Sequence, residues 1–112
     1  MKNVENKKIN LTIEKYNEKT KSLIDVDFQT NYFDLFYECC KRPMQKGGGY
    51  TWEAIEKINR IKEICKKAQN NVGEIVEVED ADFNFIKERV LSNTWSTFDS
   101  SLLDLKNYLE KI

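Results

Sequence analysis

The segment Tyr32–Cys40 constrains the fold most strongly, because it is apolar on almost every side of a helix. Thr30 or Asn31 can cap its N-terminus, Asp34 falls in the first turn, where a carboxylate suits the helix dipole, and Pro43 follows its end. A helix without a polar face is either central in its own fold or covered by a partner chain. Either this helix is the core, or part of it meets another chain.

Two alternating runs before this helix predict a β-hairpin. Residues 8–16 and 24–28 alternate polar with apolar side chains, and the polar residues 17–20 lie between them as a turn. The alternation predicts one inward-facing apolar set: Ile9, Leu11, Ile13, Ile24, Val26 and Phe28.

Three further helices are expected after the glycine cluster at 47–49. They cover about 52–70, capped by Thr51, about 80–92, capped by Asp80, and about 97–111, with a short extended piece at 74–79. The apolar stripe of the longest helix comprises Trp52, Ile55, Ile58, Ile61, Cys65 and Ala68. We therefore expect an α+β fold, mainly helical, in which an N-terminal antiparallel hairpin packs on a cluster of about four helices. Residues 1–112 form a single domain, with 1–7 as a disordered tail.

The composition argues against several classes of protein. The chain has 112 residues, of which 40% are hydrophobic and 33% charged, with a net charge of −1. Disordered chains combine low hydrophobicity with high net charge, and nucleic-acid binders usually carry a strong positive excess. Histidine is absent, which removes imidazole-based catalysis and His-ligated metals. We expect no cofactor, no metal and no enzymatic activity.

The cysteines and the N-terminus favour a cytoplasmic location. Cys39, Cys40 and Cys65 are odd in number and two are adjacent, which does not suit a disulfide framework. We interpret them as buried thiols, with Cys40 the first candidate if one is reactive. The polar N-terminus lacks the apolar stretch of a secretion signal, and no apolar run approaches membrane-spanning length.

An acidic segment precedes the helix at 80–92. Asp80, Asp82 and Asn84 match the first three ligands of a calcium loop, but Phe85 and Leu91 occupy the positions that require glycine and glutamate. The pattern is more typical of a helix N-terminus rich in carboxylates.

Two surfaces are candidates for binding. One joins aromatic anchors to an acidic rim: Trp95, Phe98, Glu77, Glu79, Asp80 and Asp82. We expect alanine at Asp80 and Asp82 to slow association and to leave the fold mostly intact. The other is an anion site of basic and glycine residues before a helix N-terminus: Lys41, Arg42, Lys46, Gly47 and Gly48.

The order of the elements supports one resemblance. The hairpin at 8–28, the helix ending at Pro43, the glycine loop, the amphipathic helix at 52–68 and the leucine-rich terminal helix resemble small accessory proteins of tailed bacteriophages and prophages. That resemblance implies a non-enzymatic protein-binding module in the bacterial cytoplasm, acting as an assembly factor or as an inhibitor of a host protein. A nucleic-acid or anion binder is the alternative, and homo-oligomers are left open.

Overall fold

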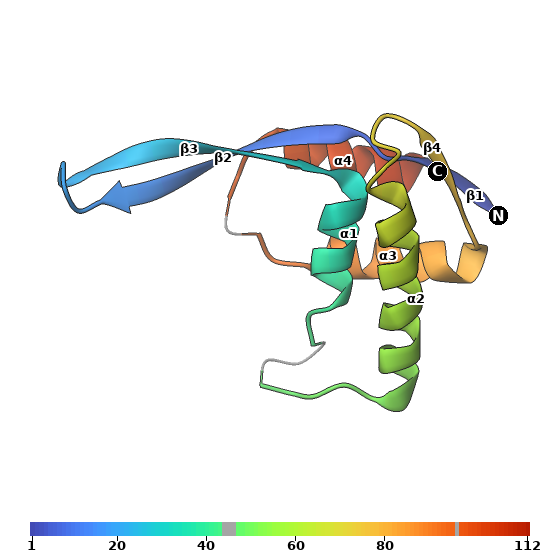
Figure 1. Ribbon diagram of the computed structural model, residues 1–112. Coiled ribbons are helices and arrows are strands. Elements are labelled where there is room, and N and C mark those ends of the chain that lie inside the picture. Colours follow the sequence, from blue (N-terminus) through green and yellow to red (C-terminus); the bar gives the residue numbers. More distant parts are fainter. Residues whose placement is uncertain (44–46, 96) are drawn as a thin grey trace.

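The computed structural model describes residues 1–43, 47–95 and 97–112 (Figure 1). In chain order its elements are β1 (Lys2–Glu5), β2 (Lys8–Asn17), β3 (Ser22–Asn31), α1 (Tyr32–Cys40), α2 (Trp52–Ala68), β4 (Ile75–Val78), α3 (Asp80–Ser92) and α4 (Ser101–Lys111). The strands form two antiparallel pairs, β1–β4 and β2–β3. The chain is therefore α+β. Its four helices account for less than half of the residues, so the expectation of a mainly helical chain overstates their share.

Helix α1 lies at the centre of the fold. It begins where the sequence predicts, because the Asn31 side chain accepts a hydrogen bond from the Asp34 backbone N–H at 3.0 Å. Tyr37 is its one half-buried apolar residue, and the other apolar side chains of the helix are buried. Helices α2 and α3 both pack against it. The core alternative for this segment is therefore confirmed.

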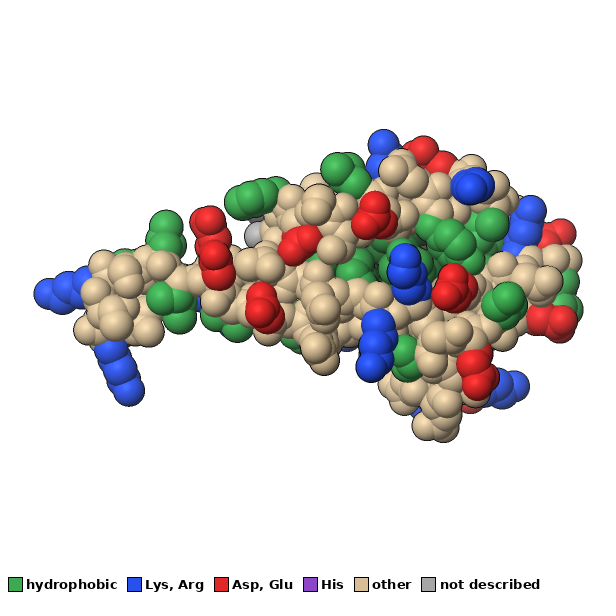
Figure 2. Space-filling model, turned by 90° about the horizontal axis from the view of Figure 1, so that it is seen from above, with side chains coloured by type: hydrophobic (Ala, Val, Ile, Leu, Met, Phe, Trp, Pro, Cys, Tyr) green, Lys and Arg blue, Asp and Glu red, His purple; other side chains and the backbone are tan. Residues whose placement is uncertain are grey.

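The β2–β3 hairpin is confirmed but is longer than predicted, and only its base joins the core. Ile9 and Leu11 are buried, whereas Ile24 and Phe28 are exposed on the same face of the hairpin. The expectation that Ile24 and Phe28 point into the core is therefore wrong. A strand of ten residues extends about 33 Å, farther than the helices beneath it reach, so the outer part of the hairpin projects from the body (Figures 1 and 2). We call residues 12–28 the hairpin arm.

The N-terminal segment is ordered as a strand, which corrects the expectation of a disordered tail over 1–7. Strand β1 pairs with β4, with Val4 opposite Val76 and Lys2 opposite Val78. Val4 and Val78 are both buried. The segment folds because β4, distant in sequence, supplies a pairing partner and an apolar contact that no local pattern reveals.

Helix α2 joins the core through its second half. Thr51 caps its N-terminus as predicted, and Ile61 and Cys65 are buried. Trp52 and Ile55 lie on the predicted stripe but are exposed, because α2 runs beyond α1 (Figure 1). The predicted residues therefore do share one face of the helix, but only part of that face is buried.

Helix α3 spans the range predicted for it, but the prediction that Asp80 caps it is wrong: Asp80 lies in the first turn, and Glu79 occupies the N-cap position without a side-chain hydrogen bond. Helix α4 begins later than predicted. The Asp99 carboxylate accepts a hydrogen bond from the Ser101 N–H at 2.9 Å, so Asp99 acts at the helix start. Residues 97–99 bind β2 instead of extending the helix.

Candidate functional site

Two carboxylates of the predicted acidic rim, those of Asp80 and Asp82, form ion pairs, and of these only Asp82 is buried. Asp82 is buried and binds the Arg60 guanidinium at 2.9 Å, which joins α3 to α2. Asp80 binds the ammonium group of Met1 at 2.9 Å, and this hydrogen bond, together with the positive charge, lowers the pKa of the Asp80 carboxyl. Asp82 is thus a structural residue, and a partner cannot reach it without breaking its ion pair.

The other two rim residues remain accessible. Glu77 lies on β4 and Glu79 immediately precedes α3, and both side chains are exposed. They line a shallow hollow of about 360 Å³ together with Arg60 and Asp82. Among the described residues neither glutamate forms an ion pair.

The predicted aromatic anchors do not share a surface with this rim. Trp95 and Phe98 follow the C-terminal end of α3, whereas the acidic residues lie at its N-terminal end (Figure 1). A helix of 13 residues separates the two groups by about 20 Å. Trp95 is half-buried against the core, while Phe98 is 87% exposed. Phe98 is therefore the more accessible anchor of the predicted pair.

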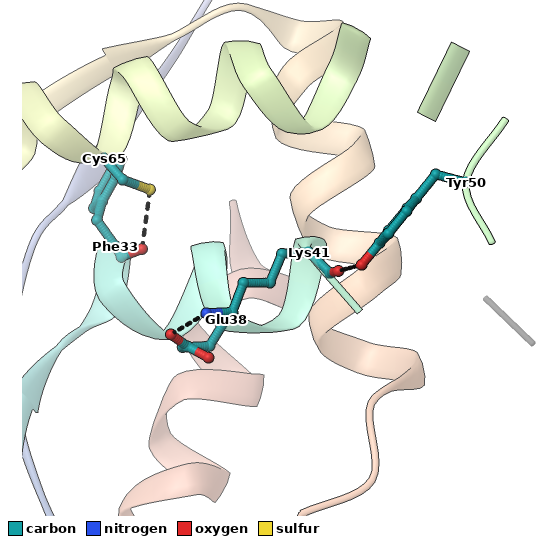
Figure 3. Close-up of polar contacts among 5 residues, drawn as sticks. All are labelled: Phe33, Glu38, Lys41, Tyr50 and Cys65. Carbon is teal, nitrogen blue, oxygen red and sulfur yellow. Dashed lines mark hydrogen bonds and ion pairs between the residues drawn. The ribbon is translucent and has the colours of Figure 1, made fainter. Parts of the chain in front are cut away.

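The predicted anion site uses its cations within the chain. The Lys41 ammonium binds Glu38 at 2.8 Å, and the Tyr50 hydroxyl donates a hydrogen bond to the Lys41 carbonyl (Figure 3). The Arg42 guanidinium donates to the Asn93 side chain at 3.0 Å.

The other predicted residues of the anion site are Lys46, Gly47 and Gly48. Lys46 lies outside the described residues, and Gly47 and Gly48 are exposed in the loop before α2. Gly47 has a φ of +78°, in the left-handed region that glycine adopts without steric strain. Of the two described cations, Lys41 pairs with Glu38 of α1 itself, whereas Arg42 links the end of α1 to the segment that follows α3.

The three thiols are free and buried, as the sequence predicts. The Cys65 thiol donates to the Phe33 carbonyl at 3.0 Å (Figure 3). Burial raises the pKa of Cys39 to about 11 and that of Cys65 to about 12. Burial also raises the pKa of Cys40, which is fully buried, so Cys40 is a poor candidate for a reactive thiol.

No group of three or more Asp, Glu, Cys or His side chains suited to a metal ion occurs among the described residues. Asp80, Asp82 and Asn84, which resemble part of a calcium loop in sequence, lie within helix α3 instead of in a loop.

The structure reveals a surface that the sequence analysis missed, at the hairpin arm. The Thr12 N–H donates to the Asp99 carboxylate at 2.8 Å, and the Thr97 hydroxyl donates to the Thr12 carbonyl at 2.6 Å. These bonds hold Phe98 beside the arm. A hollow of about 340 Å³ is lined by Thr12, Glu14, Asp25, Phe98, Asp99 and Ser100.

Both faces of the arm carry exposed apolar side chains. Tyr16 and Leu23 lie opposite each other on the face shared with Glu14 and Asp25, and they are 61% and 67% exposed. Ile24 and Phe28 are exposed on the other face. Figure 2 shows hydrophobic side chains along this projecting end of the molecule. The sequence feature that could have indicated this surface is that Tyr16 and Leu23 are apolar but do not belong to the alternating apolar set.

In the described part of the chain, no helix combines the length and apolar character needed to cross a membrane. No protein-family model matches the chain, and neither a curated protein nor a solved structure shows significant similarity to it.

Proposed function

We propose that this chain is a non-enzymatic protein-binding module that engages its partner through the hairpin arm and Phe98. The observation that carries the proposal is the grouping of exposed apolar side chains on one projecting element. Exposed apolar groups that gather on one surface mark interaction sites, whereas isolated ones do not. Tyr16 and Phe98 are of the residue types enriched at binding hot spots and in interface cores.

The stability of the fold does not account for the arm. Only Ile9 and Leu11, at the base of the hairpin, are buried in the core. A two-stranded hairpin without a packed face is marginally stable in water. Contact with a partner would bury the apolar side chains of the arm and stabilise it.

The resemblance to phage accessory proteins supplies the two roles that we propose, an assembly factor or an inhibitor of a host protein. A projecting arm suits both roles, because it can enter a groove of a larger protein. Identification of the partner distinguishes them.

The test is affinity capture from a nuclease-treated lysate of the host, comparing three forms of the tagged chain. We expect the native chain to retain one stoichiometric partner and the double variant Tyr16→Ser/Leu23→Ser to lose it with an unchanged circular dichroism spectrum. Trp52→Ser is the matched control, because Trp52 is 83% exposed but lies on α2, away from the arm. Equal capture by all three forms would refute binding through the arm.

A further inference from the structure

One edge of β3 presents unpaired backbone groups. The Thr12 N–H and C=O bind Asp99 and Thr97, so both groups point away from β3, and Thr12 faces Asp27 as a non-hydrogen-bonded pair. In an antiparallel ladder this pattern alternates along the strand. The backbone groups that point to the outer edge of β3 are therefore those of Leu23, Asp25, Asp27 and Gln29.

The two edges of the hairpin differ in how they are covered. The outer edge of β2 is bound at Thr12 by the segment that precedes α4. Within the described part of the chain β3 pairs with β2 alone, so its outer edge has no strand beside it. An open edge of this kind is a template for pairing with another chain.

The side chains along β3 indicate which side chains a strand paired with this edge would need. Ile24, Val26 and Phe28 alternate on one face of the strand. Asp25 and Asp27 alternate on the other face, and Glu14 lies directly opposite Asp25. Like charges in directly opposite positions destabilise a sheet, and the side chains of a non-hydrogen-bonded pair lie especially close. A cation beside Glu14 and Asp25 would remove this repulsion.

We propose that the outer edge of β3 accepts an extended segment of a partner protein as a third strand, in which apolar residues alternate with lysine or arginine. The proposal rests on the proposed function and names the chemistry of its partner. Backbone hydrogen bonds would hold the segment, apolar side chains would cover Ile24, Val26 and Phe28, and basic side chains would meet Asp25 and Asp27.

A second copy of the chain suits this edge poorly. Antiparallel pairing of β3 with its copy along the full strand brings the carboxylates of Asp25 and Asp27 beside those of the other copy. The acidic residues thus select against self-pairing and in favour of a basic segment.

The test is titration of the isotope-labelled chain with an acetylated peptide of about eight residues that alternates lysine with valine. We expect amide hydrogen exchange to slow by about tenfold or more at Asp25 and Asp27. Two control peptides, one with glutamate in place of lysine and one with alternate backbone amides N-methylated, should bind at least about tenfold more weakly. Unchanged exchange along β3 in the presence of the lysine peptide would overturn the proposal.

Matched proline variants locate the edge. Each variant removes one negative charge and one backbone N–H. Asp27→Pro removes the N–H at the outer edge of β3, and Glu14→Pro removes it at the outer edge of β2. Neither N–H belongs to the β2–β3 ladder, and the amide spectrum of the hairpin verifies folding. We expect Asp27→Pro to abolish peptide binding and Glu14→Pro to retain most of it. Asp27→Asn keeps the N–H and should weaken binding only through the lost charge, so a proline variant that fails to fold leaves the charge contribution measurable.

The outcomes separate the two proposals. If substitutions at Tyr16 and Leu23 prevent partner capture while the lysine peptide leaves β3 unchanged, the arm is a binding surface and strand addition is wrong. If the lysine peptide slows amide exchange along β3 while substitutions at Tyr16 and Leu23 leave partner capture unchanged, the edge accepts strands and the proposed function is wrong. Self-association of the chain at titration concentrations, with protection of the β3 edge, would assign the edge to a second copy and overturn the basic-segment proposal.

Discussion

The side-chain carbonyl of Asn6 accepts a hydrogen bond from the backbone N–H of Phe33 at 3.1 Å. The side-chain amide of Asn6 donates to the Ala68 carbonyl at 2.9 Å, and the residue is 0% exposed. Its backbone bonds to the turn before β4, where its carbonyl accepts from Gly73 and its N–H donates to Glu74. One buried side chain thus connects β1, the first turn of α1 and the last turn of α2.

Replacement of this side chain should destabilise the fold more than its size suggests. Asn6→Ala leaves the Phe33 N–H and the Ala68 carbonyl buried without their partner, so we expect the free energy of unfolding to fall by about 2–4 kcal/mol. Urea denaturation measures this change. Asn3→Ala on β1 is the control, because Asn3 is exposed and its loss should change stability by at most about 0.5 kcal/mol. Equal effects of the two variants would contradict the role given to Asn6.

The ion pair between the buried Asp82 carboxylate and the exposed Arg60 guanidinium should contribute more to stability than an ion pair that is exposed on both sides. Arg60→Ala leaves a buried carboxylate without its counter-ion and should lower the free energy of unfolding by about 1–3 kcal/mol. Lys57→Ala breaks the exposed pair with Glu53 and should cost at most about 0.5 kcal/mol. Thermal denaturation of the two variants side by side checks this.

The same pair bears on the expectation that alanine at Asp80 and Asp82 leaves the fold mostly intact. Alanine at Asp82 is expected to reduce stability, so it is not a clean probe of partner association. Glu77 and Glu79 are the appropriate probes of that surface, because both are exposed.

The buried thiols predict a loss of stability in alkaline solution. Burial raises the pKa of Cys39 and Cys65 from 9.0 to about 11 and about 12. Below pH 9.0 the thiols are protonated in both states, and above it they ionise in the unfolded chain alone. Each thiol should then lower the free energy of unfolding by about 1.4 kcal/mol per pH unit until its folded pKa is reached. Urea denaturation over this range should show a shallower slope in Cys65→Ala, and an identical slope would argue against burial of this thiol.

Acid should release the segment at 97–99 from β2. Hydrogen bonds from Ser101 and Thr12 lower the pKa of the Asp99 carboxyl from 3.8. The contribution of these bonds is present above that value and is lost as the pH falls through the lower folded value. We expect amide hydrogen exchange at Thr12, corrected for its intrinsic pH dependence, to accelerate in acid in the native chain. Asp99→Asn should abolish this pH dependence, and its persistence in that variant would assign the change to another group.

Local patterns determined much of the fold. The bounds of α1 follow from its apolar content, the Asn31 cap and Pro43, and those of α3 from its apolar content and the polar residues that follow it. The hairpin follows from alternation, since side chains of a strand point to opposite faces in turn. The burial of the three cysteines follows from their apolar surroundings and their positions on helix faces.

Tertiary structure decided which of these apolar faces are buried. Alternation and helical spacing show which side chains share a face, but they do not show which other element packs against it. Ile61 and Ile55 occupy one stripe of α2, yet only Ile61 is buried. Asp82 and Glu79 belong to one acidic run, yet only Asp82 turns toward Arg60. Pairing of β1 with β4 depends on contacts between residues 2–5 and residues 75–78, which no local window contains. The sequence by itself determined the elements and their apolar faces, and the three-dimensional packing left the hairpin arm and the edge of β3 as the open surface.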